Sequence, residues 1–432
     1  MGADGLPPVL HADRGVLRLL TCGSVDDGKS TLIGRLLYDT RSLLADTLAT
    51  LVAHAARRGL AAPDLALLTD GLTAEREQGI TIDVAYRYFS TGRRKFIIAD
   101  APGHVQYTRN MVTAASTADL ALLLVDARHG IVEQTRRHAA IATLLGVRTL
   151  VLAVNKMDLV GWSEPAYHHV VDTFHRWNEA QPATGRSARP GVIALPLCAL
   201  DGDGVVDPGV RMPWYTGPTL VDVLETAPAL VQYDASAPLR LPVQWVGRPG
   251  GDGRRTYCGR IEGGTLCAGQ QVAILPGTQC ATVASLTIGA RHLEHALAGQ
   301  SVAVTLDREL GIARGDLLVA AGSAGRPREV RDFDATVCWL SRTSLQPART
   351  YRLQHGTREL RCRVGAIDGV LDLQRLDWRD AAGTVATNEI AMISVRVEQA
   401  LFADAYDQSR STGSFIMIDD TTRETVAAGL LS

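Results

Sequence analysis

The sequence predicts an α/β domain with a sheet rich in parallel strands, followed by two antiparallel β-barrel domains. Two observations lead to this fold class. Up to about residue 225, short apolar runs alternate with amphipathic, helix-like segments, an alternation typical of a mostly parallel sheet covered on both faces. After Ala227-Pro228, strand-like runs of four to eight residues are separated by glycine-rich turns, as expected for antiparallel barrels.

The first half supplies the elements of the α/β domain. Its apolar runs predict strands over 16–20, 95–100, 120–126 and 150–155. A helix is expected over 30–37, directly behind a glycine-containing loop, and another over 134–145. The second half predicts strands over 241–246, 272–275, 301–306, 335–340, 390–397 and 415–418. An Ala/Gly/Ser-rich linker at 320–327 separates the two barrels, so the expected domains are 1–228, 229–327 and 328–432.

Composition describes an ordinary soluble protein of 432 residues, with 46% hydrophobic and 21% charged residues. A net charge of −2 gives no reason to expect a nucleic-acid or membrane surface. The longest apolar runs, such as 118–125, are too short to cross a bilayer. Seven scattered cysteines without a Cys-x-x-Cys spacing indicate reduced thiols, so we expect a cytoplasmic location.

Lysine is almost absent from the chain. Only Lys29, Lys95 and Lys156 occur among 44 basic residues, which leaves 41 arginines (44 − 3). A lysine ammonium is compact and carried on a slim stem, whereas an arginine guanidinium is broad and planar. Two of the three lysines fall inside sequence patterns that handle nucleotides, which indicates that lysine is kept where arginine cannot replace it.

The first pattern follows a predicted strand and opens a predicted helix, the context of a phosphate-binding loop. Its glycines let the backbone turn so that N–H groups and the helix N-terminus face phosphate oxygens. Lys29 is expected to bridge β- and γ-phosphates, and Ser30 to bind Mg²⁺ through its hydroxyl. The predicted phosphate-binding residues are Gly23, Ser24, Val25, Asp26, Asp27, Gly28, Lys29, Ser30 and Thr31.

Two further segments are expected around the terminal phosphate. Asp100-Ala101-Pro102-Gly103 ends a strand, so that Asp100 can hold Mg²⁺ through water and the Gly103 N–H can sense the γ-phosphate. Within 70–82, Thr81 is the candidate to bind Mg²⁺ only while that phosphate is present, which would make the segment a switch. His104 is the candidate to orient the attacking water. Lys29, Thr81 and His104 are therefore the predicted catalytic residues.

The second lysine pattern, Asn155-Lys156-Met157-Asp158, predicts guanine recognition. Guanine presents N1–H and 2-NH₂ as neighbouring donors, so a carboxylate that accepts both is required, and an Asp facing another base is left unpaired. The Lys156 stem is expected to pack over the base, while Asn155 ties this segment to the phosphate loop. Cys198-Ala199-Leu200 is expected to complete the base site, with the Ala199 N–H toward guanine O6.

The order of these motifs, together with the segments 75–82 and 100–104, resembles that of the translation-factor class of GTPases. Within that class the chain looks like the large GTPase subunit of bacterial sulfate adenylyltransferase (CysN). The pair Asp26-Asp27 distinguishes the chain from elongation factors. Val105 follows His104 where the family commonly carries Glu, and Cys198 stands where related proteins usually carry Ser or Thr. The resemblance covers essentially the whole chain, through 22–38, 70–110, 126–138, 212–220, 259–269 and 314–316.

This resemblance implies hydrolysis of GTP to GDP with Mg²⁺, and a smaller catalytic partner subunit, CysD. The partner joins sulfate to the AMP moiety of ATP, and GTP hydrolysis drives formation of the unfavourable anhydride, adenosine 5′-phosphosulfate. Some relatives continue into an adenylylsulfate kinase domain with its own phosphate loop, whereas this sequence holds one such loop.

Two other functions share many of these motifs. A translation factor that delivers aminoacyl-tRNA or a release factor would share the fold and the nucleotide, and it would bind RNA in a salt-sensitive way. The residues of segments 22–38 and 83–91 favour sulfate activation, so we expect no nucleic-acid partner. A GTP-binding scaffold without turnover is disfavoured by Lys29, Thr81 and His104.

Overall fold

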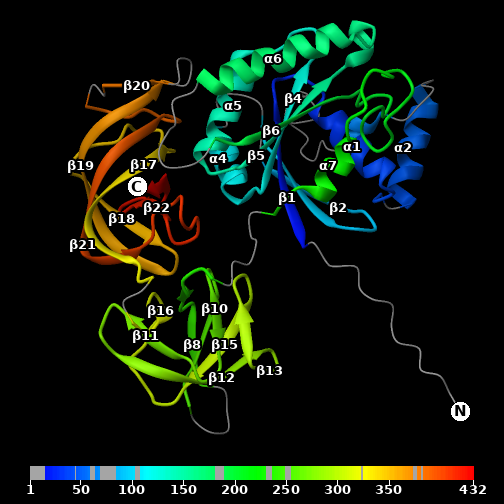
Figure 1. Cartoon of the computed structure of the whole chain (residues 1–432). Coiled ribbons are helices and arrows are strands. Elements are labelled where there is room, and N and C mark those ends of the chain that lie inside the picture. Colours follow the sequence, from blue (N-terminus) through cyan, green and yellow to red (C-terminus); the bar gives the residue numbers. More distant parts are fainter. Residues whose placement is uncertain are drawn as a thin grey trace, which may run out of the picture. The chain divides into compact units, whose positions relative to one another are not determined.

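The computed structural model divides the chain into two compact units, Met1–Leu230 and Val231–Ser432 (Figure 1). The residues that the structure describes are 15–43, 45–58, 64–68, 84–102, 108–180, 189–229, 236–248, 254–322, 325–372, 377–380 and 383–432. The first unit is built around a hydrophobic core, and each barrel of the second unit has a core of its own. The predicted fold class is confirmed, while the domain boundaries at 228/229 and 327/328 stay predictions.

The first unit is built on a six-stranded sheet in the order β2-β3-β1-β4-β5-β6. All neighbours are parallel except β2 and β3, which form an antiparallel pair at one edge. The sequence analysis did not predict β2, because only Phe89 of this edge strand is buried. The strands are β1 Val16–Gly23, β2 Ala85–Ser90, β3 Lys95–Asp100, β4 Leu120–Asp126, β5 Thr149–Asn155 and β6 Gly191–Pro196.

Helices cover both faces of this sheet, as predicted from the continuous apolar strands (Figure 1). α1 (Lys29–Asp39) and α7 (Leu220–Thr226) share one core with alternate strand residues. α7 starts at a capping box in which Thr219 and Asp222 each accept the other's backbone N–H. α4 (Thr108–Thr117), α5 (Glu133–Leu144) and α6 (Glu164–Ala180) lie on the opposite face. The remaining helical segments are α2 Ala45–Arg58, η1 Leu65–Leu68 and η3 Met157–Val160.

The first barrel of the second unit closes through one bent strand. The sequence analysis predicts a single strand over 241–246, whereas the structure divides it into β7 and β8. β7 pairs with β16 at one end of the sheet and β8 pairs with β9 at the other, so the segment joins both edges. Pro242 has no N–H, which suits a position where the strand changes partner. The strands are β7 Leu241–Pro242, β8 Trp245–Gly247, β9 Thr256–Arg260, β10 Thr265–Cys267, β11 Gln271–Leu275, β12 Cys280–Ile288, β13 Arg291–Leu293, β14 His295–Leu297, β15 Ser301–Leu306 and β16 Leu317–Ala320.

The second barrel is a ring of six strands in the order β18-β22-β23-β17-β21-β19, closed by pairing of β19 with β18, with β20 attached to β19. Two of its strands, β17 and β21, are much longer than the predicted strands 335–340 and 390–397, and β19 was not predicted. Register shifts along these three strands mark β-bulges where they bend around the core. β16 ends at Ala320 and β17 begins at Arg328, and the linker at 320–327 stays a prediction. The strands are β17 Arg328–Trp339, β18 Thr350–His355, β19 Arg358–Asp372, β20 Asp377–Arg379, β21 Ile390–Ala403, β22 Ser414–Asp419 and β23 Thr425–Leu431.

A buried ion pair connects the two barrels of the second unit. The Arg240 guanidinium, beside the first barrel's strand β7, donates to both carboxylate oxygens of Asp404, which directly follows β21 of the second barrel, at 2.8 Å and 2.7 Å. The side chains are only 5% and 12% exposed. Thr357 adds a hydrogen bond of 3.0 Å from its hydroxyl to the Val243 carbonyl. These contacts join the barrels through charge and hydrogen bonds as well as apolar packing.

The seven cysteines are free thiols, four of them buried, in keeping with the reduced state predicted from the sequence. Among the described residues, every helix is too short or too polar to span a membrane.

Candidate nucleotide site

The loop between β1 and α1 has the backbone of a phosphate-binding loop. Gly28 stands at the N-cap of α1 with φ of 94°, a left-handed conformation that glycine adopts without strain. A Cβ at this position would lie 2.5 Å from the Asn155 side-chain nitrogen, so a larger residue would also collide. Asp26 adopts a positive φ of 66° as well. Glycine is therefore required at position 28 both by conformation and by space.

The side chain of Asp27 closes this loop from within. Its carboxylate accepts the Ser24 N–H at 2.6 Å, and the Ser24 hydroxyl bonds to the Gln134 side chain on α5 at 2.9 Å. Burial raises the pKa of Asp27 above its ordinary value, against the lowering effect of its hydrogen bonds. The second Asp of the loop is thus a structural part of its turn, and α5 supports the loop from outside.

Lys29 and Asp100, two residues of the predicted site, lie close together beside the loop. The Lys29 Nζ donates to the Ala101 carbonyl at 2.8 Å and lies 3.7 Å from the Asp100 carboxylate. Thr21 of β1 is in register with Asp100 of β3 and donates its hydroxyl to that carboxylate at 3.1 Å. Lys29 is 8% exposed and Asp100 is 3% exposed, so the pair sits in a poorly solvated position. Ser30 follows in the first turn of α1.

Asn155 joins the phosphate loop to the predicted base-binding loop. Its side-chain nitrogen donates to the Asp27 carbonyl at 2.7 Å, and its side-chain oxygen accepts the Ala199 N–H at 2.9 Å. The residue is buried, and both ends of its amide have partners. The Ala199 N–H, predicted to face guanine O6, is therefore engaged by Asn155 in this structure, and its contact with O6 stays a prediction.

Lys156 reaches back to the phosphate loop from the end of β5. It adopts a positive φ of 62°, its Nζ donates to the Asp26 carbonyl, and it lies 3.1 Å from the Asp126 carboxylate. Burial alone would raise the pKa of Asp126, but hydrogen bonds from Arg128 and Lys156 outweigh it and hold that pKa well below its ordinary value. The sequence analysis missed Asp126 as a partner of Lys156. A signal was present, because Asp126 ends β4 beside Asn155, which ends β5.

The carboxylate of Asp158 faces the loop that follows β6. The Cys198 thiol donates to the Asp158 Oδ1 at 3.3 Å. Burial raises the pKa of this thiol to about 12, so it stays protonated and able to donate. Ala199 is buried next to it, whereas Leu200 is exposed. The structure thus brings together 155–158, 198–200 and the phosphate loop at the carboxyl ends of β1, β5 and β6, where ligands bind in α/β sheets.

Three predicted residues, Thr81, Gly103 and His104, lie outside the described residues, so their predicted roles stay predictions. Among the described residues no cluster of three or more His, Cys, Asp and Glu side chains is placed to hold a metal. The Ser30 hydroxyl and the Asp100 carboxylate supply oxygen donors of the kind Mg²⁺ prefers, close to Lys29. They fit a Mg²⁺ ion held partly by substrate phosphates.

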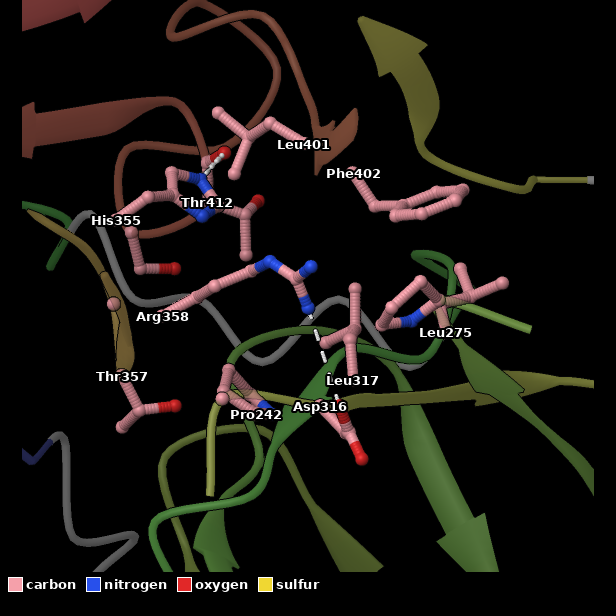
Figure 2. A pocket seen from close by; sticks show the side chains of 14 residues that line it. Pro242, Leu275, Asp316, Leu317, His355, Thr357, Arg358, Leu401, Phe402 and Thr412 are labelled. Carbon is pink, nitrogen blue, oxygen red and sulfur yellow. Dashed lines mark hydrogen bonds and ion pairs between the residues drawn. The ribbon is translucent and has the colours of Figure 1, made fainter. Parts of the chain in front are cut away.

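A separate small cavity lies in the second unit, between the ends of the two barrels (Figure 2). Its walls include Leu275, Leu317 and Phe402, and the Arg358 guanidinium points into it. Arg358 lies 4.0 Å from the Asp316 carboxylate and donates to the Gln399 side chain at 3.3 Å, so its charge is already engaged. The cavity contains none of the predicted nucleotide-binding residues, and we assign it no ligand.

Comparison with known proteins places these observations in a family. The family model of the elongation factor Tu GTP binding domain matches residues 14–232, and that of the GTP-eEF1A C-terminal domain matches 332–432. Sulfate adenylyltransferase subunit 1 of Aeromonas hydrophila is 44% identical over 99% of this chain and 89% of its own length. The same subunit of Rhizobium tropici is 47% identical, over 96% of this chain and 82% of its own.

The bifunctional enzyme CysN/CysC of Mycobacterium tuberculosis is 46% identical over 96% of this chain, which covers 67% of that longer protein. A solved structure of sup35 complexed with GMPPNP is also similar, at 22% identity, with 98% of this chain and 95% of the other covered and a TM-score of 0.44. The three relatives named before sup35 are 44–47% identical over 96–99% of this chain, and this similarity decides the assignment. The chain therefore belongs to the sulfate adenylyltransferase subunit 1 family, whose GTP-binding domain is of the elongation factor Tu type.

Proposed function

We propose that this chain binds GTP and hydrolyses it to GDP, and that hydrolysis drives formation of adenosine 5′-phosphosulfate by a catalytic partner subunit, CysD, in the cytoplasm. The observation that carries the nucleotide part is the Asn155 amide, which bonds the phosphate loop on one side and the 198–200 loop on the other. That bridge sets the phosphate-binding and base-binding segments at fixed positions relative to each other. The sulfate part is supported by the family membership.

Base recognition is assigned to Asp158. Its carboxylate accepts one hydrogen bond here, from the Cys198 thiol, and can accept more. The guanine N1–H and 2-NH₂ provide two neighbouring donors. Adenine lacks this donor pair, so bound ATP would leave the Asp158 carboxylate unpaired. Lys156 supports the base from the adjacent position, with its ammonium held between the Asp26 carbonyl and the Asp126 carboxylate.

Phosphate recognition is assigned to Lys29 and the loop N–H groups. The Lys29 ammonium is buried beside the Ala101 carbonyl and the Asp100 carboxylate. When a nucleotide binds, the ammonium would exchange the neutral Ala101 carbonyl for charged phosphate oxygens. Ser30 and Asp100 would hold Mg²⁺, which neutralises charge on the β- and γ-phosphates when bound. On the sequence patterns alone, Thr81 and the Gly103 N–H sense the γ-phosphate, and His104 orients the attacking water.

Two measurements test this function. Asp158→Asn should weaken GTP binding and favour xanthine nucleotides, because an amide can donate to the xanthine 2-oxo group; unchanged GTP affinity would contradict the base assignment. The chain co-purified with its partner should form adenosine 5′-phosphosulfate faster with GTP than with GDP. Salt-sensitive RNA binding without any GTP stimulation of that reaction would instead favour the translation-factor function.

A further inference from the structure

Arg211 lies just before α7 and binds two acidic residues that follow the 198–200 loop. Its Nη1 donates to Asp201 Oδ2 at 2.6 Å, its Nη2 donates to Asp203 Oδ2, and its Nε lies 3.4 Å from Asp203 Oδ1. The Asp203 side chain is only 8% exposed, so one of the two pairs is shielded from solvent. One guanidinium therefore holds both ends of the Asp201-Gly202-Asp203 turn.

The same guanidinium stacks on Trp162, with its central carbon 4.3 Å from the ring centroid. Trp162 adopts a positive φ of 59°, which is uncommon for a bulky residue. That backbone is fixed on both sides, since the Trp162 N–H donates to the Met157 carbonyl at 2.8 Å and the Trp214 indole donates to the Trp162 carbonyl at 2.9 Å. Arg211 is thereby connected to the turn that contains Asp158.

The turn held by Arg211 is continuous with the predicted base-binding loop. The Cys198 N–H donates to the Asp203 carbonyl at 2.9 Å, and the Gly202 N–H donates to the Cys198 carbonyl at 2.8 Å. From α1, the Arg35 side chain donates to the Ala199 carbonyl at 3.2 Å and also to the Leu200 carbonyl. Two arginines from different elements therefore hold the loop from opposite ends of its backbone.

We propose that Arg211 is a positioning residue for guanine recognition, which fixes the 198–203 loop against the Asp158 turn. This inference rests on the proposed GTP site and names the residue that sets its selectivity. Asp158 can read two guanine donors only when the loop opposite it stays in place, because a displaced loop would admit water to the carboxylate and lower the cost of a wrong base. Asn155 links the phosphate loop to this loop, but the phosphate loop also has supports of its own in Asp27 and Gln134, so we expect it to depend less on Arg211.

The arrangement requires arginine in particular. A lysine could pair with one carboxylate at a time, whereas the planar guanidinium pairs with two and stacks on an indole face. The Arg211 side chain is 42% exposed, so an ordinary surface ion pair would contribute little here. Its effect is therefore expected on the geometry of the base site, with little effect on the stability of the domain.

The test compares three ligands on the full-length chain: GTP, ITP, which lacks the guanine 2-NH₂, and tripolyphosphate, which lacks the nucleoside. For Arg211→Ala we expect GTP affinity to fall at least about tenfold, the effect of roughly one lost positioned hydrogen bond. Affinity for tripolyphosphate should change less than about twofold, because the phosphate loop is supported separately. The ratio of GTP to ITP affinity should fall toward one, and Arg211→Lys should give an intermediate ratio.

Arg93→Ala is the matched control. Arg93 is an exposed arginine on the β2–β3 hairpin, and its guanidinium lies 3.2 Å from the Glu225 carboxylate of α7. Arg93→Ala should leave all three affinities unchanged. An equal loss for the three ligands in Arg211→Ala, or an unchanged GTP-to-ITP ratio, would overturn the positioning role. If the unmodified chain itself does not prefer GTP to ITP, the proposed guanine site fails and this inference fails with it. Arg211→Lys retains a positive charge and serves as the decisive variant if the alanine variant does not fold.

Discussion

The ion pair between Arg240 and Asp404 should stabilise the second unit strongly. Asp404 accepts three hydrogen bonds, two from Arg240 at 2.8 Å and 2.7 Å and one from the Thr412 hydroxyl at 2.6 Å. Asp404→Asn keeps the shape but removes the charge and turns one acceptor into a donor that faces the guanidinium. Because both side chains are largely buried, leaving Arg240 without its counter-charge should cost about 3–5 kcal/mol.

This loss should be visible in thermal unfolding. For a unit of 202 residues (432 − 231 + 1), each kcal/mol corresponds to roughly 2–4 °C, so a loss of about 3 kcal/mol predicts a fall of about 6–12 °C in the transition of the second unit. The assay is calorimetry of the full-length chain, with amide exchange to assign the transition to β17–β23. Asp332→Asn is the control, because it breaks the exposed pair with Arg396 and should shift the transition by less than about 2 °C.

The pH dependence gives an independent check. Burial would raise the pKa of Asp404, but the hydrogen bonds from Arg240 and Thr412 outweigh it and hold that pKa below its ordinary value of 3.8. A carboxyl whose folded pKa is depressed contributes stability that is fully present above its unfolded pKa and is lost as pH falls through the folded pKa. Wild type should therefore lose its advantage over Asp404→Asn as pH falls below about 4.

Replacement of both partners separates charge burial from packing. Arg240→Met combined with Asp404→Leu should recover most of the loss, because an apolar pair of similar volume leaves no buried charge unpaired. A fall of less than about 2 °C in Asp404→Asn, or a difference between wild type and variant that does not change with pH, would refute the reasoning.

Three further predictions concern the nucleotide site. Lys29→Arg should abolish measurable GTP binding, because a guanidinium does not fit beside the Ala101 carbonyl and Asp100. Lys95 stands at an exposed strand end, so Lys95→Arg should bind GTP like wild type in the same titration. Asn155→Ala should destabilise the first unit by about 2–4 kcal/mol in urea unfolding, since the Asp27 carbonyl and the Ala199 N–H both lose their buried partner; full stability would contradict the bridge. Cys198→Ser should retain GTP affinity to within about threefold, because a hydroxyl also donates to Asp158; a loss of more than about tenfold would show that the bulk of the thiol is needed.

The strand and motif order was predictable because it depends on local signals. A run of apolar residues ends at Asp100, at Asp126 and at Asn155, and in a parallel sheet these ends meet at one edge whatever the intervening loops do. The sequence placed Lys29 and Asp100 in one predicted nucleotide site although 71 positions (100 − 29) separate them, and in the structure the Lys29 Nζ lies 3.7 Å from the Asp100 carboxylate.

The missed features all depend on packing between distant segments. Asp126 ends a strand like many aspartates, and only its register beside Asn155 shows that it holds Lys156. Arg211 is one of 41 arginines, and nothing in its neighbours along the chain indicates the two carboxylates or the indole that it meets. The break between β7 and β8 follows from barrel closure, which a local pattern cannot encode.

The groups around each cation explain why some positions carry lysine and others arginine. Lys29 and Lys156 donate to main-chain carbonyls in narrow positions, one below the phosphate loop and one beside it, where a single point charge fits and must be able to exchange partners. Arg128, Arg211 and Arg240 each meet carboxylates with two or more nitrogens, a geometry that a lysine cannot reproduce. Such pairs hold a fixed geometry, whereas Lys29 and Lys156 stand at positions where, in the proposed function, a ligand replaces a protein partner. Exchange of lysine for arginine at Lys29 or Lys156 should therefore weaken binding, and exchange of arginine for lysine at Arg128, Arg211 or Arg240 should lose the alignment of their carboxylate partners.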